Sequence, residues 1–253
     1  MLSQRAKDLF AQLGLPYEAV AIKLCYGRPE GVARIDKQLS FCQFVHEAQD
    51  AGKQFYITAD DDNCAGKMVL GMVEESGLGA SGQAGYDFGI FKTPAANSRL
   101  YEMMPRLTKG AHNYVVFSPI SLCDFDPDIV IAVADTNNAE ILMRATSYIS
   151  GDIWESKLSY SVSCAWMYAY PYASGKVNYC ITGMHHGMKR RGTYPSGLHI
   201  IAIPYQKLDE VIQALDEMDW IPIAFREDEQ SKQELARRMA SWQEIDPTLS
   251  LKE

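Results

Sequence analysis

The chain has 253 residues, of which 47% are hydrophobic, so it is long and apolar enough to bury a core. Its formal net charge is −8 and its pI is near 5.2. This acidic balance argues against a nucleic-acid partner, because such binding depends on clustered Lys and Arg. No apolar run is long enough to cross a bilayer, and the charged stretch Met1–Leu13 is unlike a secretion signal. We therefore expect a cytoplasmic protein with neither a nucleic-acid nor a membrane partner.

Helical and strand patterns alternate along the chain, which favours an α/β fold, with a mixed α+β arrangement as the alternative. In chain order we expect a helix over 2–13, a strand over 17–24, a helix over 38–51, a strand over 55–58, a helix over 65–75, a strand over 86–91, a helix over 95–107 and a strand over 114–119. A strand over 129–134, a helix over 138–149, strands over 177–181 and 198–203, and helices over 208–218 and 227–244 follow. No low-complexity linker interrupts this order, so we expect one compact domain over residues 1–253.

The last predicted helix, over 227–244, is charged and has few apolar positions. Leu235, Met239 and Trp242 are the side chains with which it would dock on the body of the protein or on a second subunit. A homo-oligomer is therefore among the expected partners.

The order of features over residues 17–107 recurs over residues 127–218. Each half has an apolar strand, a cysteine, a Gly-Lys pair and a second cysteine, in that order: Val20–Leu24, Cys42, Gly52-Lys53 and Cys64, then Ile129–Val133, Cys164, Gly175-Lys176 and Cys180. Duplicated halves commonly pack about a pseudo-twofold axis. We therefore predict two strand–helix repeats whose four cysteines converge on one site.

Four thiolates are the usual ligands of an iron–sulfur cluster and also of structural zinc. Cys42, Cys64, Cys164 and Cys180 are far apart in sequence and include no Cys-x-x-Cys pair, so their positions in the two halves carry the argument. We expect them to bind a [4Fe–4S] cluster. Zinc, or no metal and plain core packing, are the alternatives. Cys25 and Cys123 have no counterpart in the other half and are expected to be spectators.

The segment Gly183–Arg191 is the richest in functional side chains and holds three consecutive positive charges. We expect a glycine-bounded loop that binds the substrate, in which His185 or His186 turns toward a metal or the substrate while Lys189 and Arg190 contact an anionic ligand. Arg191 offers a further anion contact. The alternative is a basic loop exposed to solvent.

With these features in place, the chain resembles the family numbered 169 among the domains of unknown function, also labelled ArCR. The resemblance runs from about Tyr17 to Met218 and depends on short motifs in a consistent order: Val20-Ala21-Ile22-Lys23, Phe41-Cys42, Glu47-Ala48, Cys64-Ala65-Gly66, Leu70-Gly71, Ser118-Pro119, Pro127-Asp128-Ile129-Val130, Cys164 and Ile203-Pro204. It implies that Cys42, Cys64, Cys164 and Cys180 are the family-type cysteines and that the protein is an iron–sulfur protein of anaerobic metabolism. The chain departs from the family pattern at the last cysteine, where Tyr179 stands in place of the glycine common in the family.

The leading hypothesis is a redox or electron-transfer protein, or a cluster-based catalyst acting on a small molecule, with a redox protein or a small anion as its partner. The alternative is a non-catalytic module that binds a small anion and uses its cysteines only for packing. Whether the protein is an enzyme is left open, because no catalytic residue and no reaction follow from the sequence.

Overall fold

The computed structural model describes residues 1–246 and 248. At its centre is one sheet of six strands in the order β2-β3-β1-β4-β6-β5, and every neighbouring pair is antiparallel. The strands are β1 (Tyr17–Cys25), β2 (Phe55–Ile57), β3 (Tyr114–Pro119), β4 (Ile129–Ala134), β5 (Asn178–Ile181) and β6 (His199–Pro204). The predicted α/β class is therefore confirmed, with an antiparallel sheet.

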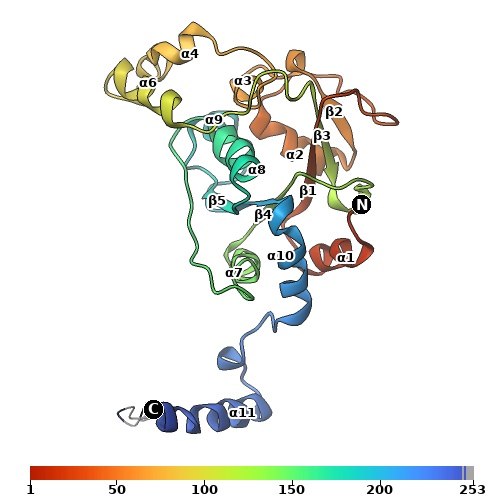
Figure 1. Ribbon diagram of the computed structural model, residues 1–253, viewed down its shortest axis with the longest axis vertical. Coiled ribbons are helices and arrows are strands. Elements are labelled where there is room, and N and C mark those ends of the chain that lie inside the picture. The colour runs from red at the N-terminus through yellow and green to blue at the C-terminus, as the bar shows by residue number, and fades with distance from the viewer. Residues whose placement is uncertain (247, 249–253) are drawn as a thin grey trace.

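Helices cover both faces of the sheet (Figure 1), which is why all six residues of β4 are buried. Alternate side chains of a strand point to opposite faces. In β4, Ile129, Ile131 and Val133 therefore join one hydrophobic core, and Val130, Ala132 and Ala134 join the other. The apolar run of this strand thus serves two cores at once.

The two faces carry different sets of helices. The first is covered by α1 (Gln4–Gln12), α7 (Thr136–Ala145) and α10 (Tyr205–Glu217), which are regular amphipathic helices. The second is covered by α2 (Phe41–Ala51), the π-helical segment η3 (Ala165–Ala169), α8 (Tyr170–Ser174), and the short helices α3 (Gly66–Val69) and α9 (His186–Arg191). The predicted cysteines belong to this second, less regular face.

Two groups of helices stand apart from the sheet in Figure 1. The helices α4 (Gly77–Ser81), α5 (Gln83–Asp87) and α6 (Pro94–Met103) pack on one another at one end of the molecule. At the other end, α11 (Glu229–Ala240) and α12 (Trp242–Ile245) replace the single helix predicted over 227–244. Short 3₁₀ turns complete the described elements: η1 (Ala59–Asp61), η2 (Ile120–Leu122) and η4 (Ile223–Phe225).

The strand predicted over 86–91 is wrong, because this segment begins in α5 and continues in turns. The reason is a close contact with α6. Gly85 lies directly against Asn97, where a Cβ atom would come within 2.4 Å of the Asn97 side chain. Asn97 also donates a hydrogen bond to the Gly82 carbonyl (3.0 Å). Small residues and the buried Asn97 amide thus pack α5 against α6. The segment therefore does not form the strand that its alternating aromatic residues predict.

The predicted equivalent strands Val20–Leu24 and Ile129–Val133 lie in β1 and β4, side by side at the centre of the sheet. On the β1 side β3 and then β2 follow, and on the β4 side β6 and then β5. This order is compatible with a twofold relation but does not establish that the halves superpose. The internal duplication and the single-domain organisation therefore remain predictions.

Within residues 1–246 and 248, none of the helices has both the length and the apolar character needed to cross a membrane.

Candidate functional site

A cavity of about 600 Å³ opens between α2, the turn before α3, α5 with the turn after it, α6, the segment before η3, and α9. Cys42, Cys64 and Cys164 all line it, although they lie far apart in the sequence. The rest of its wall combines apolar, small polar and basic side chains, among them Phe88, Ile90, Tyr101, Val162, Ser163, His186, Arg190 and Arg191. The structure thus brings three of the four predicted cysteines to one place.

Cys42 is held by the start of α2. Ser40 and Gln43 form a capping box there, in which the Ser40 N–H donates to Gln43 Oε1 (3.2 Å). The Ser40 hydroxyl also lies 3.0 Å from Cys42 Sγ. The first turn of the helix therefore fixes the thiol at the rim of the cavity.

Cys64 is positioned by a second segment that is joined to the first by backbone hydrogen bonds. Leu39 N–H donates to the Asp61 carbonyl (3.0 Å), and Asn63 N–H donates to the Leu39 carbonyl (2.9 Å). These bonds place the turn before Cys64 directly beside the turn before Cys42. Two cysteines separated by 21 residues are thereby held as neighbours.

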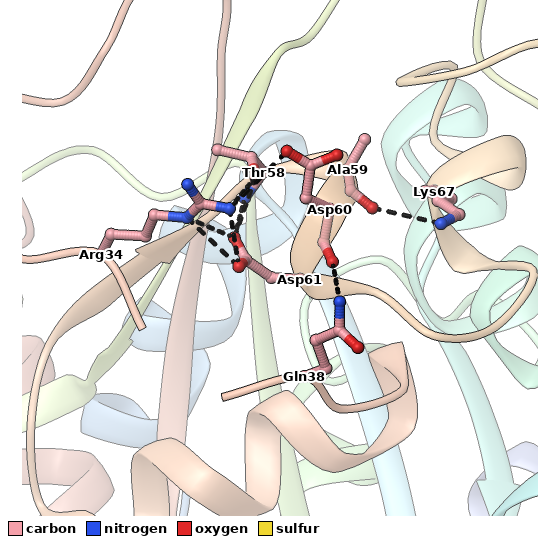
Figure 2. Close-up of polar contacts among 7 residues, drawn as sticks. All are labelled: Arg34, Gln38, Thr58, Ala59, Asp60, Asp61 and Lys67. Atoms are coloured by element: carbon pink, nitrogen blue, oxygen red, sulfur yellow. Dashed lines mark hydrogen bonds and ion pairs between the residues drawn. The ribbon is translucent and has the colours of Figure 1, made fainter. Parts of the chain in front are cut away.

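Figure 2 shows the polar contacts that stiffen this junction. The Arg34 guanidinium makes a bidentate ion pair with Asp61, with Nη2 2.9 Å from Oδ1 and Nε 2.9 Å from Oδ2. Gln38 donates to the Asp60 carbonyl (2.9 Å), and Lys67 Nζ donates to the Ala59 carbonyl (3.3 Å). Burial alone would raise the pKa of Asp61, but hydrogen bonds from Arg34 and Thr58 outweigh burial and lower it.

Asp62 and Gly66 complete the Cys64 turn. The buried Asp62 carboxylate accepts hydrogen bonds from the backbone N–H groups of Cys64 (3.2 Å) and Lys67 (2.7 Å). A Cβ atom on Gly66 would lie 2.1 Å from Cδ2 of Phe41, so only glycine lets α3 approach α2 this closely. The carboxylate thus orients the turn, and the glycine allows it to pack.

Cys164 enters the cavity from an unusual backbone. It directly precedes the π-helical segment Ala165–Ala169, and π-helical turns occur often at functional sites. Val162, two residues earlier, has φ +57°, a strained conformation for a β-branched residue. Asn178 in β5 supports the segment by donating to the Trp166 carbonyl (2.7 Å). The strained backbone at Val162 and the hydrogen bond from Asn178 together fix the backbone that carries the Cys164 thiol.

Burial controls the protonation of two of the cavity thiols, Cys42 and Cys164. It raises the pKa of Cys42, although the Ser40 hydrogen bond and the Arg191 charge act in the opposite direction. The pKa of Cys164 is raised well above its ordinary value, first by burial and then by the neighbouring Cys64, Asp62 and Cys42. Both groups are therefore neutral thiols at neutral pH unless a metal binds them.

The basic segment forms helix α9 and not the loop predicted for it. Arg190 and Arg191 line the cavity, and so does His186, whose ring stacks on Phe88 at 5.6 Å. Burial and the two arginine charges lower the pKa of His186, so its ring is neutral at neutral pH. One helical turn thus presents two guanidinium groups to the cysteines.

The remaining predicted site residues lie elsewhere. Cys180 is 1% exposed inside β5, where its Sγ lies 3.4 Å from Met167 Sδ, and it does not line the cavity. Burial raises its pKa to about 12. His185 is fully buried, and Lys189 is exposed outside the cavity wall. The two predicted spectators, Cys25 and Cys123, also lie away from the cavity.

Several residues of the site were not among those the sequence indicated. Phe88, in the turn after α5, and Tyr101, in α6, come from a part of the chain that the sequence did not connect with the cysteines. Asp62 is a third such residue, and its carboxylate is buried beside Cys64. The Asp-Asn-Cys-Ala-Gly run was the available signal, because a carboxylate two residues before a cysteine can cap the turn that follows.

Comparison with known proteins agrees with the family resemblance. The family model DUF169, described as "Uncharacterised ArCR", matches residues 8–214, so the chain belongs to this family. An uncharacterised protein of Methanocaldococcus jannaschii is 25% identical over 221 residues, which cover 85% of this chain and 94% of that protein. No solved structure matches. The function therefore has to be argued from the site.

The packing of Gly66 on Phe41 gives a first test. Gly66→Ala should lower the free energy of unfolding by roughly 1–3 kcal/mol, because the buried Phe41 ring would have to move. Urea unfolding measures this loss. Gly27→Ala is the matched control, since a Cβ atom at Gly27 meets nothing within 4 Å. Equal stability of the two variants would contradict the packing described here.

Proposed function

We propose that this protein binds a [4Fe–4S] cluster through Cys42, Cys64 and Cys164 and uses it in redox or small-molecule chemistry. The observation that carries the proposal is the convergence of these three thiols, from separate parts of the chain, on one cavity of about 600 Å³. Thiolates are the ligands that such clusters require. All six cysteines are free, so none of these three is tied up in a disulfide.

The arrangement of the thiols favours a cluster over structural zinc. Ligands of one tetrahedral zinc ion, each about 2.3 Å from the metal, lie roughly 3.8 Å from one another. Throughout the described part of the chain, no group of three or more His, Cys, Asp or Glu side chains is close enough to hold a single ion. A cluster spreads its ligands over several irons, so its thiolates need not meet at a single metal ion.

Three cysteine ligands would leave one iron without a protein ligand. Such an iron can bind a small molecule as a Lewis acid, while the cluster as a whole can carry an electron. Around it, the chain supplies an apolar wall from Phe88, Ile90 and Tyr101, and positive charge from Arg190 and Arg191. These guanidinium groups offset the negative charge that the thiolates bring. A bound cluster and six free thiols fit a reducing compartment such as the cytoplasm.

Replacement of single cysteines tests the ligand set. In protein purified without oxygen, Cys42→Ser, Cys64→Ser and Cys164→Ser should each lose most of the bound iron and acid-labile sulfide and bleach the visible absorption. Cys180→Ser is the matched control, because Cys180 is as deeply buried as Cys164 but lies outside the cavity. It should keep its iron. Iron and sulfide are measured per chain, and unfolding by urea separates ligand loss from general instability.

The ligand assignment would be contradicted by wild-type protein that holds zinc or no metal after anaerobic purification. It would also be contradicted if Cys180→Ser lost iron as fully as the other three variants. The second outcome would point to the four-cysteine set predicted from the sequence.

The raised pKa values of Cys42 and Cys164 predict how cluster retention depends on pH. Ligation requires the thiolates, so protons compete with iron up to the raised pKa values of these thiols, and affinity should increase as the pH rises. We expect retention against an iron chelator to improve by more than about tenfold per pH unit between roughly pH 6 and 8. Retention that is flat, or that falls as the pH rises, would argue against thiolate ligands.

A further inference from the structure

Two guanidinium groups line the cavity without an acidic partner. In the described residues, no carboxylate lies within ion-pair distance of Arg190 or Arg191. The only side-chain hydrogen bond of the pair that the structure gives runs from Arg191 Nη1 to the Gly187 carbonyl (3.3 Å). Arg190 is exposed and Arg191 is half-buried, and without ion pairs they give this cavity a local positive charge, which suits an anion, in a chain of net charge −8.

The carboxylate of Asp62, which also belongs to the site, does not pair with these arginines. The buried Asp62 carboxylate is engaged by the backbone N–H groups of Cys64 and Lys67 (3.2 and 2.7 Å). It belongs to the turn on the cysteine side, and Arg190 and Arg191 belong to α9. Apart from the Arg191 bond to the Gly187 carbonyl, the donors of the two guanidinium groups are therefore free for a bound molecule.

Apolar and aromatic side chains share the lining of the cavity with the arginines. They are Phe88, Ile90, Tyr101 and Val162. The Arg190 guanidinium lies over the Phe88 ring at 5.0 Å, and the His186 ring stacks on the same side chain at 5.6 Å. Phe88 thus holds the Arg190 guanidinium beside the apolar part of the cavity wall. A ligand that fits this pairing has a charged head and an apolar body.

We infer that the cavity binds a small organic carboxylate, with its carboxylate held by the guanidinium groups of Arg190 and Arg191 and its apolar body against Phe88, Ile90 and Tyr101. A planar carboxylate matches the paired N–H donors of a guanidinium group. The volume of about 600 Å³ is within the usual range of small-molecule sites. The inference deepens the proposed function by assigning a ligand to the same cavity, but it does not need a bound cluster in order to be tested.

Calorimetric titration of the full chain is the direct experiment, with benzoate as the probe. Benzamide has the same size without the charge, acetate has the charge without the apolar body, and inorganic phosphate is a different anion. We expect benzoate to bind more tightly than all three. The titrations are run on reduced, chelator-treated protein and again on iron-loaded protein, with iron and sulfide measured on each sample.

Variants of α9 supply the matched controls. Arg190→Gln and Arg191→Gln should each weaken benzoate binding roughly ten- to hundredfold. Lys189→Gln removes the same charge from an exposed side chain of the same helix, outside the cavity wall, and should leave the affinity within about twofold. Thermal unfolding checks that all three variants are folded.

Three results would overturn the inference. Benzamide or phosphate binding as tightly as benzoate would exclude a carboxylate as the recognised group. If Lys189→Gln weakened benzoate binding equally, the arginines would act only through the overall charge of this surface and not by direct contact. If neither form of the wild type bound benzoate, the cavity would not be a site for organic carboxylates. Loss of iron from the arginine variants would then assign the arginines to the cluster alone. Failure of the cluster proposal gives a different result, since an iron-free wild type would still bind benzoate.

Discussion

The antiparallel pairing of β1 with β4 is the contact on which the site depends. Val20 pairs with Ile131 and Ile22 with Ile129, more than 100 residues away in the chain. β1 leads into the segment that carries Cys42 and Cys64, and the chain beyond β4 supplies Cys164 and α9. Contacts above the sheet continue this junction: the Tyr168 hydroxyl donates to the Phe41 carbonyl (2.9 Å), and the Tyr194 hydroxyl donates to Gln49 Oε1 (2.7 Å). The cavity therefore exists only when both parts of the chain have folded onto one sheet.

The unusual backbone conformations of this fold lie beside the same cavity. Val162 holds a left-handed backbone conformation at φ +57°, and a π-helical segment follows it. Burial keeps the pKa of Cys164 high, so its thiol stays protonated within the core. The strained backbone is unfavourable for stability by itself, and such strain is typical of a site that binds something. The opposite face of the sheet, covered by α1, α7 and α10, shows the regular apolar packing expected of a face with only a structural role.

Much of the fold could be predicted because its strands are unmistakable. The predicted bounds of β3 and β4 match the structure, since continuous apolar runs bounded by turn residues define them. Local sequence patterns could not reveal the tertiary contacts that override a local strand preference. The contact of Gly85 in α5 with Asn97 in α6 is the example. At the site, matching the order of features in the two halves grouped Cys180 with Cys64. Strand alternation instead turns Cys180 into the core. The sequence indicated three of the thiols and the basic segment, whereas their meeting with Phe88 and Tyr101 depends on long-range packing.

Diffraction from crystals grown without oxygen, with anomalous data on both sides of the iron absorption edge, would test directly whether the cavity binds an iron–sulfur cluster. We predict an iron-specific peak inside the cavity, with Cys42, Cys64 and Cys164 as its protein ligands and Cys180 apart from it. Anomalous signal at the zinc edge alone, or iron bound through Cys180, would contradict a cluster bound by these three cysteines.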